Sequence, residues 1–515
     1  MNTIMNRKVI VFRSAAMLLT VAAFAGETGI LTPPASPGPK INGPKIYGVR
    51  PGHPFLYRIP ATGTRPIKFS AKGLPKGLIL DRATGMITGA VKERGEYVVK
   101  LRVRNSHGSA KRLFKIVAGD RLALTPPMGW STWYMAFAKI SDSLVREQAD
   151  AMISTGLADH GYSYIDIDDG WNVKPNAPDP AIGGPARDAN GNLLSNKNFP
   201  DMQAMTDYVH GKGLKTGIYI SPGPLTCAGF EGSYQHEEKD AQQFSNWGFD
   251  LLKYDLCSYG KLIKNKKDAA EYTKPYALMG SLLKKLDRDV IFNLCEYGLG
   301  DVWEWGREVG GNFWRTTGDV GIAKDGLYKS MSAFGFGQAG KEKWAGPGGW
   351  NDPDNILIGR ILWKQQLTPT PLTHDEQYTW VTLWSLIASP LVIGGDLPTL
   401  DDFTLSLLTN DEVIDVDQDV LGRQAVPVSR NGDLEVWSKD LADGSKAVGL
   451  FNRGEQDTEI AVRWADLGLS GKRVVRDLWR QEDRGTFEQE FRMLVNRHGA
   501  ALLSIRANRR RPRAR

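Results

Sequence analysis

Cysteine and histidine are scarce in this sequence. Its 515 residues include three cysteines, Cys227, Cys257 and Cys295, and seven histidines without a His-x-His or His-Glu-x-x-His pattern. Three cysteines allow at most one intramolecular disulfide, which excludes a disulfide-stapled fold. The scattered histidines disfavour a transition-metal centre. We expect no cofactor and no metal, although an all-oxygen Mg²⁺ or Ca²⁺ site stays open as an alternative.

A hydrophobic run long enough to cross a membrane is also missing. The longest candidate, Ser14–Ala25, has about a dozen apolar residues, too few for a hydrocarbon core of ~30 Å. Arg7, Lys8 and Arg13 precede it, and Ala23-Phe24-Ala25 has the small-x-small pattern of a cleavage site. Residues 1–25 therefore predict a cleaved signal peptide and a periplasmic or extracellular protein.

The sequence has no internal basic stripe. Its 65 Lys and Arg against 58 Asp and Glu give a net charge of +7, but the final segment carries five of the positive charges, on Arg509, Arg510, Arg511, Arg513 and Arg515. A solvated terminal tail at 508–515 explains such a cluster better than a nucleic-acid site. We expect no nucleic-acid partner.

Turn residues divide the chain into segments of different pattern. Five prolines between Pro33 and Pro44 mark a linker over 26–44, and short alternating runs over 45–119 predict a small β-sandwich. Its Gly73–Leu78 and Thr84–Gly89 stretches resemble the immunoglobulin-like modules of secreted bacterial enzymes. After Leu421 short β runs return, which predicts a C-terminal antiparallel β-sandwich over 419–507.

Repeated βα units are predicted between these β domains, over 120–418. Ser141 or Asp142 caps an expected helix that ends near Gly156, and others precede Gly213 and Gly248. Eight strands over ~290 residues favour a (β/α)₈ barrel, and no Gly-x-Gly-x-x-Gly follows the first strand. The later expected strands are Tyr162–Ile167, Lys215–Ile220, Phe249–Tyr254, Val290–Leu294, Asn312–Thr316, Trp344–Trp350 and Pro390–Ile393.

Acidic residues follow the apolar runs of the predicted barrel. A barrel's active site lies at the C-terminal ends of its strands, so six strands ending in this way indicate a catalytic ring of carboxylates. The residues are Asp168, Asp169, Asp255, Glu296, Asp319, Asp352, Asp354 and Asp396, and the aromatic residues Trp130, Trp133, Trp171 and Tyr219 accompany them in the barrel segment. Glycoside cleavage needs two carboxyl groups, polar groups for the hydroxyls and a ring for stacking, and this inventory supplies them.

Lys253 and Asp255 lie two residues apart on a predicted strand. Both can point into the barrel, where the ammonium would favour the ionised carboxylate. Asp255 is therefore the nucleophile candidate, with a buried structural ion pair as the alternative. The sequence pattern alone defines neither the protonation nor the direction of Asp319.

Residues 123–425 resemble the α-galactosidases of glycoside hydrolase family 27, the group that contains the lysosomal and plant enzymes. Five ordered blocks carry the resemblance: Pro126–Trp130; Gly161–Tyr164 with Ile167–Trp171; Thr226–Gly229 with Gly232-Ser233; Trp247–Asp250 with Lys253–Asp255; and Trp314–Asp319 with Gly348–Asp354. The resemblance implies a retaining glycosidase on a (β/α)₈ barrel. Its expected partner is a carbohydrate with a terminal α-galactose.

The resemblance also implies residue roles. Asp255 matches the nucleophile and Asp319 the general acid/base. It implies a disulfide between Cys227 and Cys257, with Cys295 left unpaired. The sugar-binding positions comprise the stacking ring Trp130, the pair Asp168 and Asp169 for the 4- and 6-hydroxyls, the cations Lys253 and Arg315, and the pocket residues Tyr219, Cys227, Glu296 and Asp354.

Three alternatives stay open. Glu296 stands where N-acetylgalactosaminidases of the family have a small residue, so its bulk and charge favour galactose. The paired Asp168 and Asp169 lean against a β-L-arabinopyranosidase. A non-catalytic carbohydrate-binding barrel would require the loss of Asp255 or Asp319, and both are present.

Overall fold

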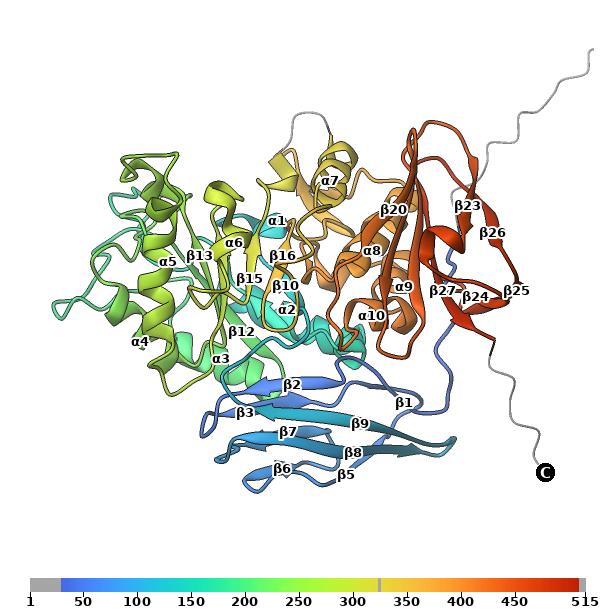
Figure 1. The fold of residues 1–515 in the computed structure, drawn as a ribbon. Coiled ribbons are helices and arrows are strands. Elements are labelled where there is room, and N and C mark those ends of the chain that lie inside the picture. The colour runs from blue at the N-terminus through green and yellow to red at the C-terminus, as the bar shows by residue number, and fades with distance from the viewer. Residues whose placement is uncertain (1–28, 323–325, 509–515) are drawn as a thin grey trace, which may run out of the picture.

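The structure is a computed structural model that describes residues 29–322 and 326–508 (Figure 1). The expected signal segment and the five tail arginines lie outside the described residues. A barrel forms the centre of the molecule, with a small β module along one end and a larger β domain at one side. In the part of the chain that is described, no helix combines the length and hydrophobicity needed to cross a membrane.

Eight parallel strands form the barrel, which confirms the predicted fold class. They follow one another in chain order, and the last pairs with the first. An isolated parallel bridge between Ile356 and Ile393 links the last strand to the chain that follows the seventh. The strands are β10 (Met128–Ser131), β11 (Tyr164–Asp166), β12 (Lys215–Ile220), β13 (Leu251–Asp255), β14 (Ile291–Cys295), β15 (Phe313–Arg315), β16 (Trp350–Asp352) and β19 (Leu391–Ile393).

The helices surround this sheet, and several of them begin at a residue whose side chain caps the helix. Ser141 accepts a hydrogen bond from the Leu144 amide and starts α2, and Gly248 ends α4 with a positive φ of 95°. The α-helices are α1 (Trp133–Ala136), α2 (Asp142–Ser154), α3 (Met202–Gly211), α4 (Glu237–Trp247), α5 (Ala269–Leu283), α6 (Val302–Trp305), α7 (Leu327–Phe336), α8 (His374–Ile387), α9 (Asp402–Leu408) and α10 (Asp411–Asp417). The 3₁₀ turns are η1 (Leu157–His160), η2 (Cys257–Lys261), η3 (Leu299–Asp301), η4 (Val320–Ile322), η5 (Leu397–Thr399) and η6 (Ala465–Leu467).

The N-terminal module is a two-sheet β structure. In β8 alternate residues, among them Val99, Leu101 and Val103, are buried in its core. One sheet holds β2 (Ile46–Val49), β9 (Gly108–Ala118), β8 (Gly95–Asn105) and β5 (Lys68–Lys72), and the other β3 (Phe55–Arg58), β7 (Met86–Gly89) and β6 (Leu78–Leu80). A short pair joins β1 (Lys40–Ile41) to β4 (Ala61–Thr62), so the chain already pairs within the expected linker.

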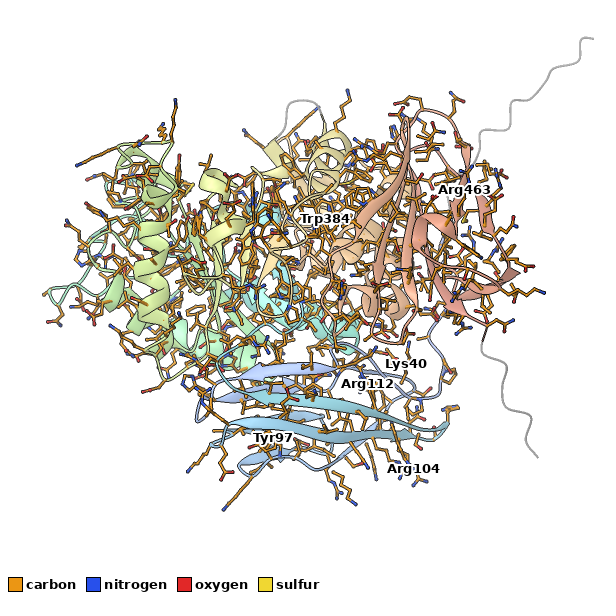
Figure 2. The ribbon with its side chains drawn as sticks, viewed as in Figure 1. Lys40, Tyr97, Arg104, Arg112, Trp384 and Arg463 are labelled. Atoms are coloured by element: carbon orange, nitrogen blue, oxygen red, sulfur yellow. A yellow bond between two sulfur atoms is a disulfide. The ribbon has the colours of Figure 1, made fainter. Side chains whose placement is uncertain are left out.

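The C-terminal domain is an antiparallel β structure, as predicted. Its larger sheet has the order β20 (Val426–Asn431), β21 (Leu434–Asp440), β22 (Lys446–Asn452), β27 (Ala500–Ala507), β24 (Arg473–Asp477) and β25 (Glu482–Phe487), and β23 (Thr458–Arg463) pairs with β26 (Glu490–Val495). The barrel helix α8 packs against β27 and β22. Figure 2 shows Trp384 of α8 inside the molecule, between the barrel and this domain.

The structure differs from the sequence prediction in two places, at the start of β16 and just after it. The expected strand Trp344–Trp350 is wrong, because β16 begins only at Trp350 and the preceding Gly346 and Gly348 have positive φ values of 156° and 91°. A hairpin of β17 (Arg360–Trp363) and β18 (Gln366–Pro369) follows β16 outside the barrel sheet and was not predicted.

Candidate active site

The C-terminal ends of five of six consecutive barrel strands bring the predicted acidic residues together. Asp255 is the last residue of β13 and Asp352 the last residue of β16, Glu296 follows β14, and the others lie in the loops after β11, β15 and β16. All but Asp319 are buried in the structure. The residues of this acidic cluster are Asp168, Asp169, Asp255, Glu296, Asp319, Asp352 and Asp354. Asp396 is not counted in this cluster. Its carboxylate accepts hydrogen bonds from Gln148 and Thr399 instead.

Two tyrosine hydroxyls hold the carboxylate of Asp255. Tyr219 on β12 donates to Oδ2 at 3.1 Å, and Tyr297 after β14 donates to Oδ1 at 2.5 Å. Burial raises the pKa of Asp255 to about 6, against the opposing effects of Lys253 and the Tyr297 hydroxyl. Asp255 is therefore mostly ionised at neutral pH, because that pH lies about one unit above its pKa.

Lys253 lies inside the barrel, as its spacing predicts. Its ammonium forms an ion pair with Asp168 Oδ2 at 2.8 Å and lies 5.3 Å from the ring centre of Tyr219. The charge of Lys253 lowers the pKa of Asp255, which agrees with the expected effect on that carboxylate. The direct partner of the ammonium, however, is Asp168, which lies 85 residues away in the sequence.

The adjacent Asp169 is held by the loop that follows β12. The Thr226 hydroxyl donates to its Oδ1 at 2.8 Å, and the Ala228 amide donates to its Oδ2 at 2.7 Å. Burial nevertheless raises the pKa of Asp169 to about 7. Asp168 and Asp169 thus lie side by side, with one paired to an ammonium and the other fixed by neutral donors.

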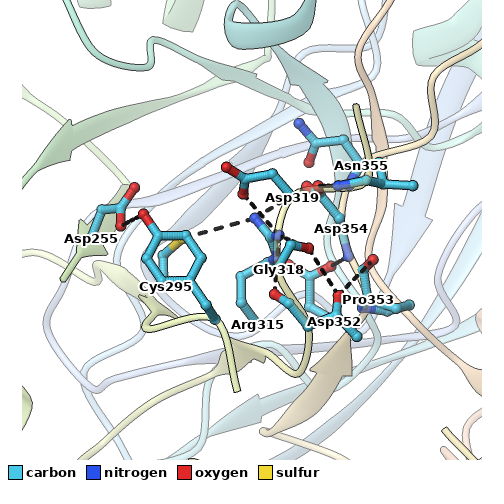
Figure 3. A network of polar contacts seen from close by, with 12 residues as sticks. Asp255, Cys295, Arg315, Gly318, Asp319, Asp352, Pro353, Asp354 and Asn355 are labelled. Atoms are coloured by element: carbon cyan, nitrogen blue, oxygen red, sulfur yellow. Dashed lines mark hydrogen bonds and ion pairs between the residues drawn. The ribbon is translucent and has the colours of Figure 1, made fainter. Parts of the chain in front are cut away.

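Arg315 connects the acidic residues on the other side of the site (Figure 3). Its Nη2 contacts Asp319 Oδ1 at 3.1 Å and donates to the Gly318 carbonyl at 2.7 Å, while Nη1 contacts Asp354 Oδ1 at 3.2 Å. Asp354 also accepts from the Tyr134 hydroxyl at 2.6 Å. The side chain of Asp319 is 25% exposed, whereas that of Arg315 is 4% exposed, so Asp319 is the member of this network that can reach water.

The burial and protonation of Glu296 differ from what the sequence predicts. It is fully buried, its Oε1 accepts from the Gly298 amide at 3.3 Å, and its Oε2 has no hydrogen-bond partner within the described residues. Burial raises its pKa well above the usual value, which favours the neutral acid. The structure therefore does not support the negative charge expected at this position, whereas the bulk of Glu296 remains available for exclusion.

Trp130 is fully buried, and its indole N–H donates to the Gly395 carbonyl at 2.7 Å. A ring without an exposed face cannot stack on a sugar, so the structure does not support the stacking role expected for it. The reason is local, because Trp130 lies inside β10, whose four residues are all buried. Trp133 begins α1 just beyond the strand end and is partly exposed.

The disulfide prediction is confirmed. Cys227 and Cys257 are bonded, and Cys295 is free and buried. The bridge lies beside Asp255, because the hydroxyls of Tyr219 and Tyr297 lie 3.1 Å from Cys257 Sγ and 3.3 Å from Cys227 Sγ. Both sulfurs are bonded to each other, so they are not available as metal ligands.

Sequence reasoning missed two tyrosines of this site. Tyr134 holds Asp354, and Tyr297 holds Asp255. Each follows a residue that the sequence analysis had singled out, Trp133 and Glu296, but a tyrosine beside a motif indicates no particular partner. Chemically, the site offers a buried carboxylate near its pKa and a more exposed carboxyl next to an arginine, an arrangement suited to covalent acid/base catalysis.

Three family models match this chain. The alpha galactosidase A model matches residues 125–419, the alpha galactosidase C-terminal beta sandwich domain matches residues 431–505, and an Ig-domain model matches residues 39–119. The first two cover the barrel and the C-terminal domain. The third includes β1, which agrees with the pairing of that strand inside the module.

Similar proteins come from plants and bacteria. Alpha-galactosidase 2 of Arabidopsis thaliana is 37% identical over 396 residues, which are 76% of this chain and 92% of the plant protein. A solved Bacteroides fragilis structure has a TM-score of 0.83 and 35% identity, and the match covers 91% of this chain and 98% of that one. A β-L-arabinopyranosidase of Geobacillus stearothermophilus has a TM-score of 0.64 and 26% identity, with 75% and 97% covered.

Proposed function

The chain belongs to the α-galactosidases of glycoside hydrolase family 27, and we propose that it releases terminal non-reducing α-D-galactose from oligo- or polysaccharides by a retaining mechanism. One observation carries the proposal. Asp255, at the end of β13, is a buried carboxylate oriented by two hydroxyls, and Asp319 across the site is a partly exposed carboxyl on Arg315. These are the two carboxyls that retaining hydrolysis requires.

Asp255 acts as the nucleophile. One of its oxygens forms a bond to C1 of the galactose as the bond between C1 and the aglycone oxygen breaks. Its ammonium neighbour Lys253 favours the ionised form that this attack needs. A carboxylate with a pKa of about 6 is ionised at neutral pH and poorly solvated, which makes it a better nucleophile than an exposed carboxylate.

Asp319 acts as general acid and then as general base. It gives its proton to the departing aglycone oxygen and later takes a proton from the water that attacks C1. Its 25% exposed side chain gives that water access to the carboxylate.

The remaining polar residues hold the sugar. Asp168 and Asp169 accept hydrogen bonds from the 4- and 6-hydroxyls, and Lys253 holds Asp168 through their ion pair. Tyr219 and the Cys227–Cys257 bridge form the wall beside the nucleophile. Arg315 forms ion pairs with both Asp319 and Asp354 and so holds Asp319 in place. The stacking ring is Trp133 rather than Trp130, because Trp133 is the one with an exposed surface.

The chain is exported, and it consists of a signal peptide and three domains. Residues 1–25 form the signal peptide, the Ig-like module runs from β1 to residue 119, the barrel covers 120–418, and the C-terminal domain covers 419–507. Support for export comes from the Cys227–Cys257 disulfide, which is more common in periplasmic and extracellular proteins than in the cytosol.

A β-L-arabinopyranosidase activity is the second candidate, since a Geobacillus enzyme with that activity has the same fold. Hydrolysis of three p-nitrophenyl glycosides, the α-galactoside, the β-L-arabinopyranoside and the α-N-acetylgalactosaminide, separates the candidates. We expect the highest kcat/KM on the α-galactoside. A preference for either of the other two substrates, or the absence of hydrolysis, would refute the proposed function.

A further inference from the structure

Resting on the proposed function, we propose that Tyr297 is a positioning residue for the nucleophile: its hydroxyl, bonded to Asp255 Oδ1, fixes the carboxylate plane from the open side of the site and keeps Asp255 ionised. Tyr219 alone leaves the carboxylate free to turn about its Cβ–Cγ bond, because it contacts only Oδ2. With Tyr297 on Oδ1, each oxygen has its own donor, and one orientation is favoured.

The two tyrosines hold Asp255 from different parts of the fold. Tyr219 belongs to β12, whose ladder pairs it with Lys253, and is 1% exposed. Tyr297 lies in the loop after β14 and is only partly buried. Tyr297 is therefore the donor on the solvent side, where a sugar enters.

The backbone places Tyr297 in a narrow turn. Its φ is 63°, and the following Gly298 has a φ of 80°. A Cβ added at Gly298 would lie 2.5 Å from the Thr316 carbonyl oxygen, so the turn packs directly against the chain between Arg315 and Asp319. The hydroxyl also lies 3.3 Å from Cys227 Sγ. The phenol is thus confined between the disulfide and the nucleophile.

The chemical consequence follows from what a donor does to a carboxylate. An O–H group that donates to the ionised form stabilises that form, and this bond counters the effect of burial on the pKa of Asp255. Burial also raises the pKa of Tyr297 itself, so the phenol keeps its proton and stays a donor. The other titratable groups that interact with Asp255 are Lys253, Asp168, Asp169, Tyr219, Tyr276, Cys295, Glu296 and Asp319.

In the reaction, Tyr297 donates without losing its proton. When one oxygen of Asp255 forms the ester with C1, the hydroxyl remains bonded to the carboxyl group. When water displaces the ester, the same hydroxyl stabilises the carboxylate that leaves. The bond therefore favours breakdown of the ester as well as correct attack.

The test is the pH profile of kcat/KM for Tyr297→Phe on p-nitrophenyl α-galactoside. The acid limb of this profile reports the ionisation of groups in the free enzyme. Loss of the donor should raise the acid-limb pKa by about one unit and lower kcat by about tenfold. The matched control is Tyr254→Phe, which removes a buried hydroxyl from the residue next to Asp255 in β13, where it has no hydrogen-bond partner within the described residues. Its acid limb should stay in place.

A second variant keeps the proposal testable if Tyr297→Phe does not fold. Replacement of Tyr297 by 3-fluorotyrosine keeps the shape and makes the phenol a stronger donor, so the acid limb should move to lower pH. An acid limb unchanged in either folded variant would overturn the role of Tyr297. Failure of the wild-type enzyme to hydrolyse the α-galactoside at any pH would instead refute the proposed function, so the two failures are distinguishable.

Discussion

Replacement of the proposed nucleophile should stabilise the protein while it abolishes activity. The pKa of Asp255 is raised to about 6 in the folded chain, whereas an unfolded aspartate has a value of about 3.9. The folded state therefore binds a proton more tightly, and its stability falls as pH rises from about 4 to about 6. Two pH units correspond to about 3 kcal/mol of unfolding free energy.

Asp255→Asn removes this cost. At pH 4, where the wild-type carboxyl is protonated when folded, we expect similar stability for the two proteins. By pH 7 the variant should be more stable by up to about 3 kcal/mol, less whatever the amide loses in its bonds with the two tyrosines. Turnover of p-nitrophenyl α-galactoside should fall by at least about 10³-fold.

The assay is urea unfolding at pH 4, 5, 6 and 7. The control is Asp207→Asn, which removes an exposed carboxylate of α3, away from the acidic cluster. Only the Asp255 variant should show a stability gain that grows between pH 4 and pH 7. An equal or lower stability of Asp255→Asn at pH 7 would refute the reasoning from burial, and near-normal turnover in the folded variant would refute the role of Asp255.

Two further predictions concern the surroundings of the nucleophile. Glu296→Ser should lower α-galactosidase activity by about five- to two-hundred-fold, because the loss of a buried hydrogen-bonding side chain costs about 1–3 kcal/mol. The smaller side chain should also allow some hydrolysis of the α-N-acetylgalactosaminide. Parallel assays check this, and a wild-type enzyme that prefers the N-acetylated substrate contradicts it. Loss of the Cys227–Cys257 bridge, which closes a separation of 30 residues, should cost about 3–4 kcal/mol in the chain-entropy model. Thermal unfolding of the Cys227→Ser, Cys257→Ser double variant measures it, and an unchanged Tm speaks against that estimate.

Much of the barrel could be predicted because its strands are continuous apolar runs between turn residues. The range Lys215–Ile220 was predicted to the residue, since five of its six residues are buried and Gly213 precedes it. Trp344–Trp350 failed because its glycines adopt positive φ, which hydrophobicity does not reveal. β1 was missed because two residues show no periodicity.

The acidic strand ends could be predicted as well, but their partners could not. Position after a strand places Asp168, Asp255 and Asp319 at one end of the barrel. The pairing of Lys253 with Asp168 depends on which neighbouring strand comes closest, and this is a three-dimensional property. The same holds for Arg315, whose two ion pairs reach Asp319 and the more distant Asp354.

Burial explains the two corrected residues. Trp130 and Glu296 carry side chains that can bind a sugar, and the sequence gives no measure of how far each lies from the surface. Trp130 lies within its strand and is covered, while Trp133 lies three residues later and is not. Glu296 is covered too, and low solvation favours its neutral form.

The central claim is that Asp255 forms a covalent bond to galactose during turnover. The most direct test is peptide mapping by mass spectrometry after the enzyme has reacted with an activated fluorogalactoside. The fluorine slows breakdown of the ester, so the covalent intermediate accumulates. We predict one galactosyl ester, on the peptide that contains Asp255, and none in Asp255→Asn. An ester on another carboxylate, or no ester together with β-galactose as the first product by NMR, would contradict the claim.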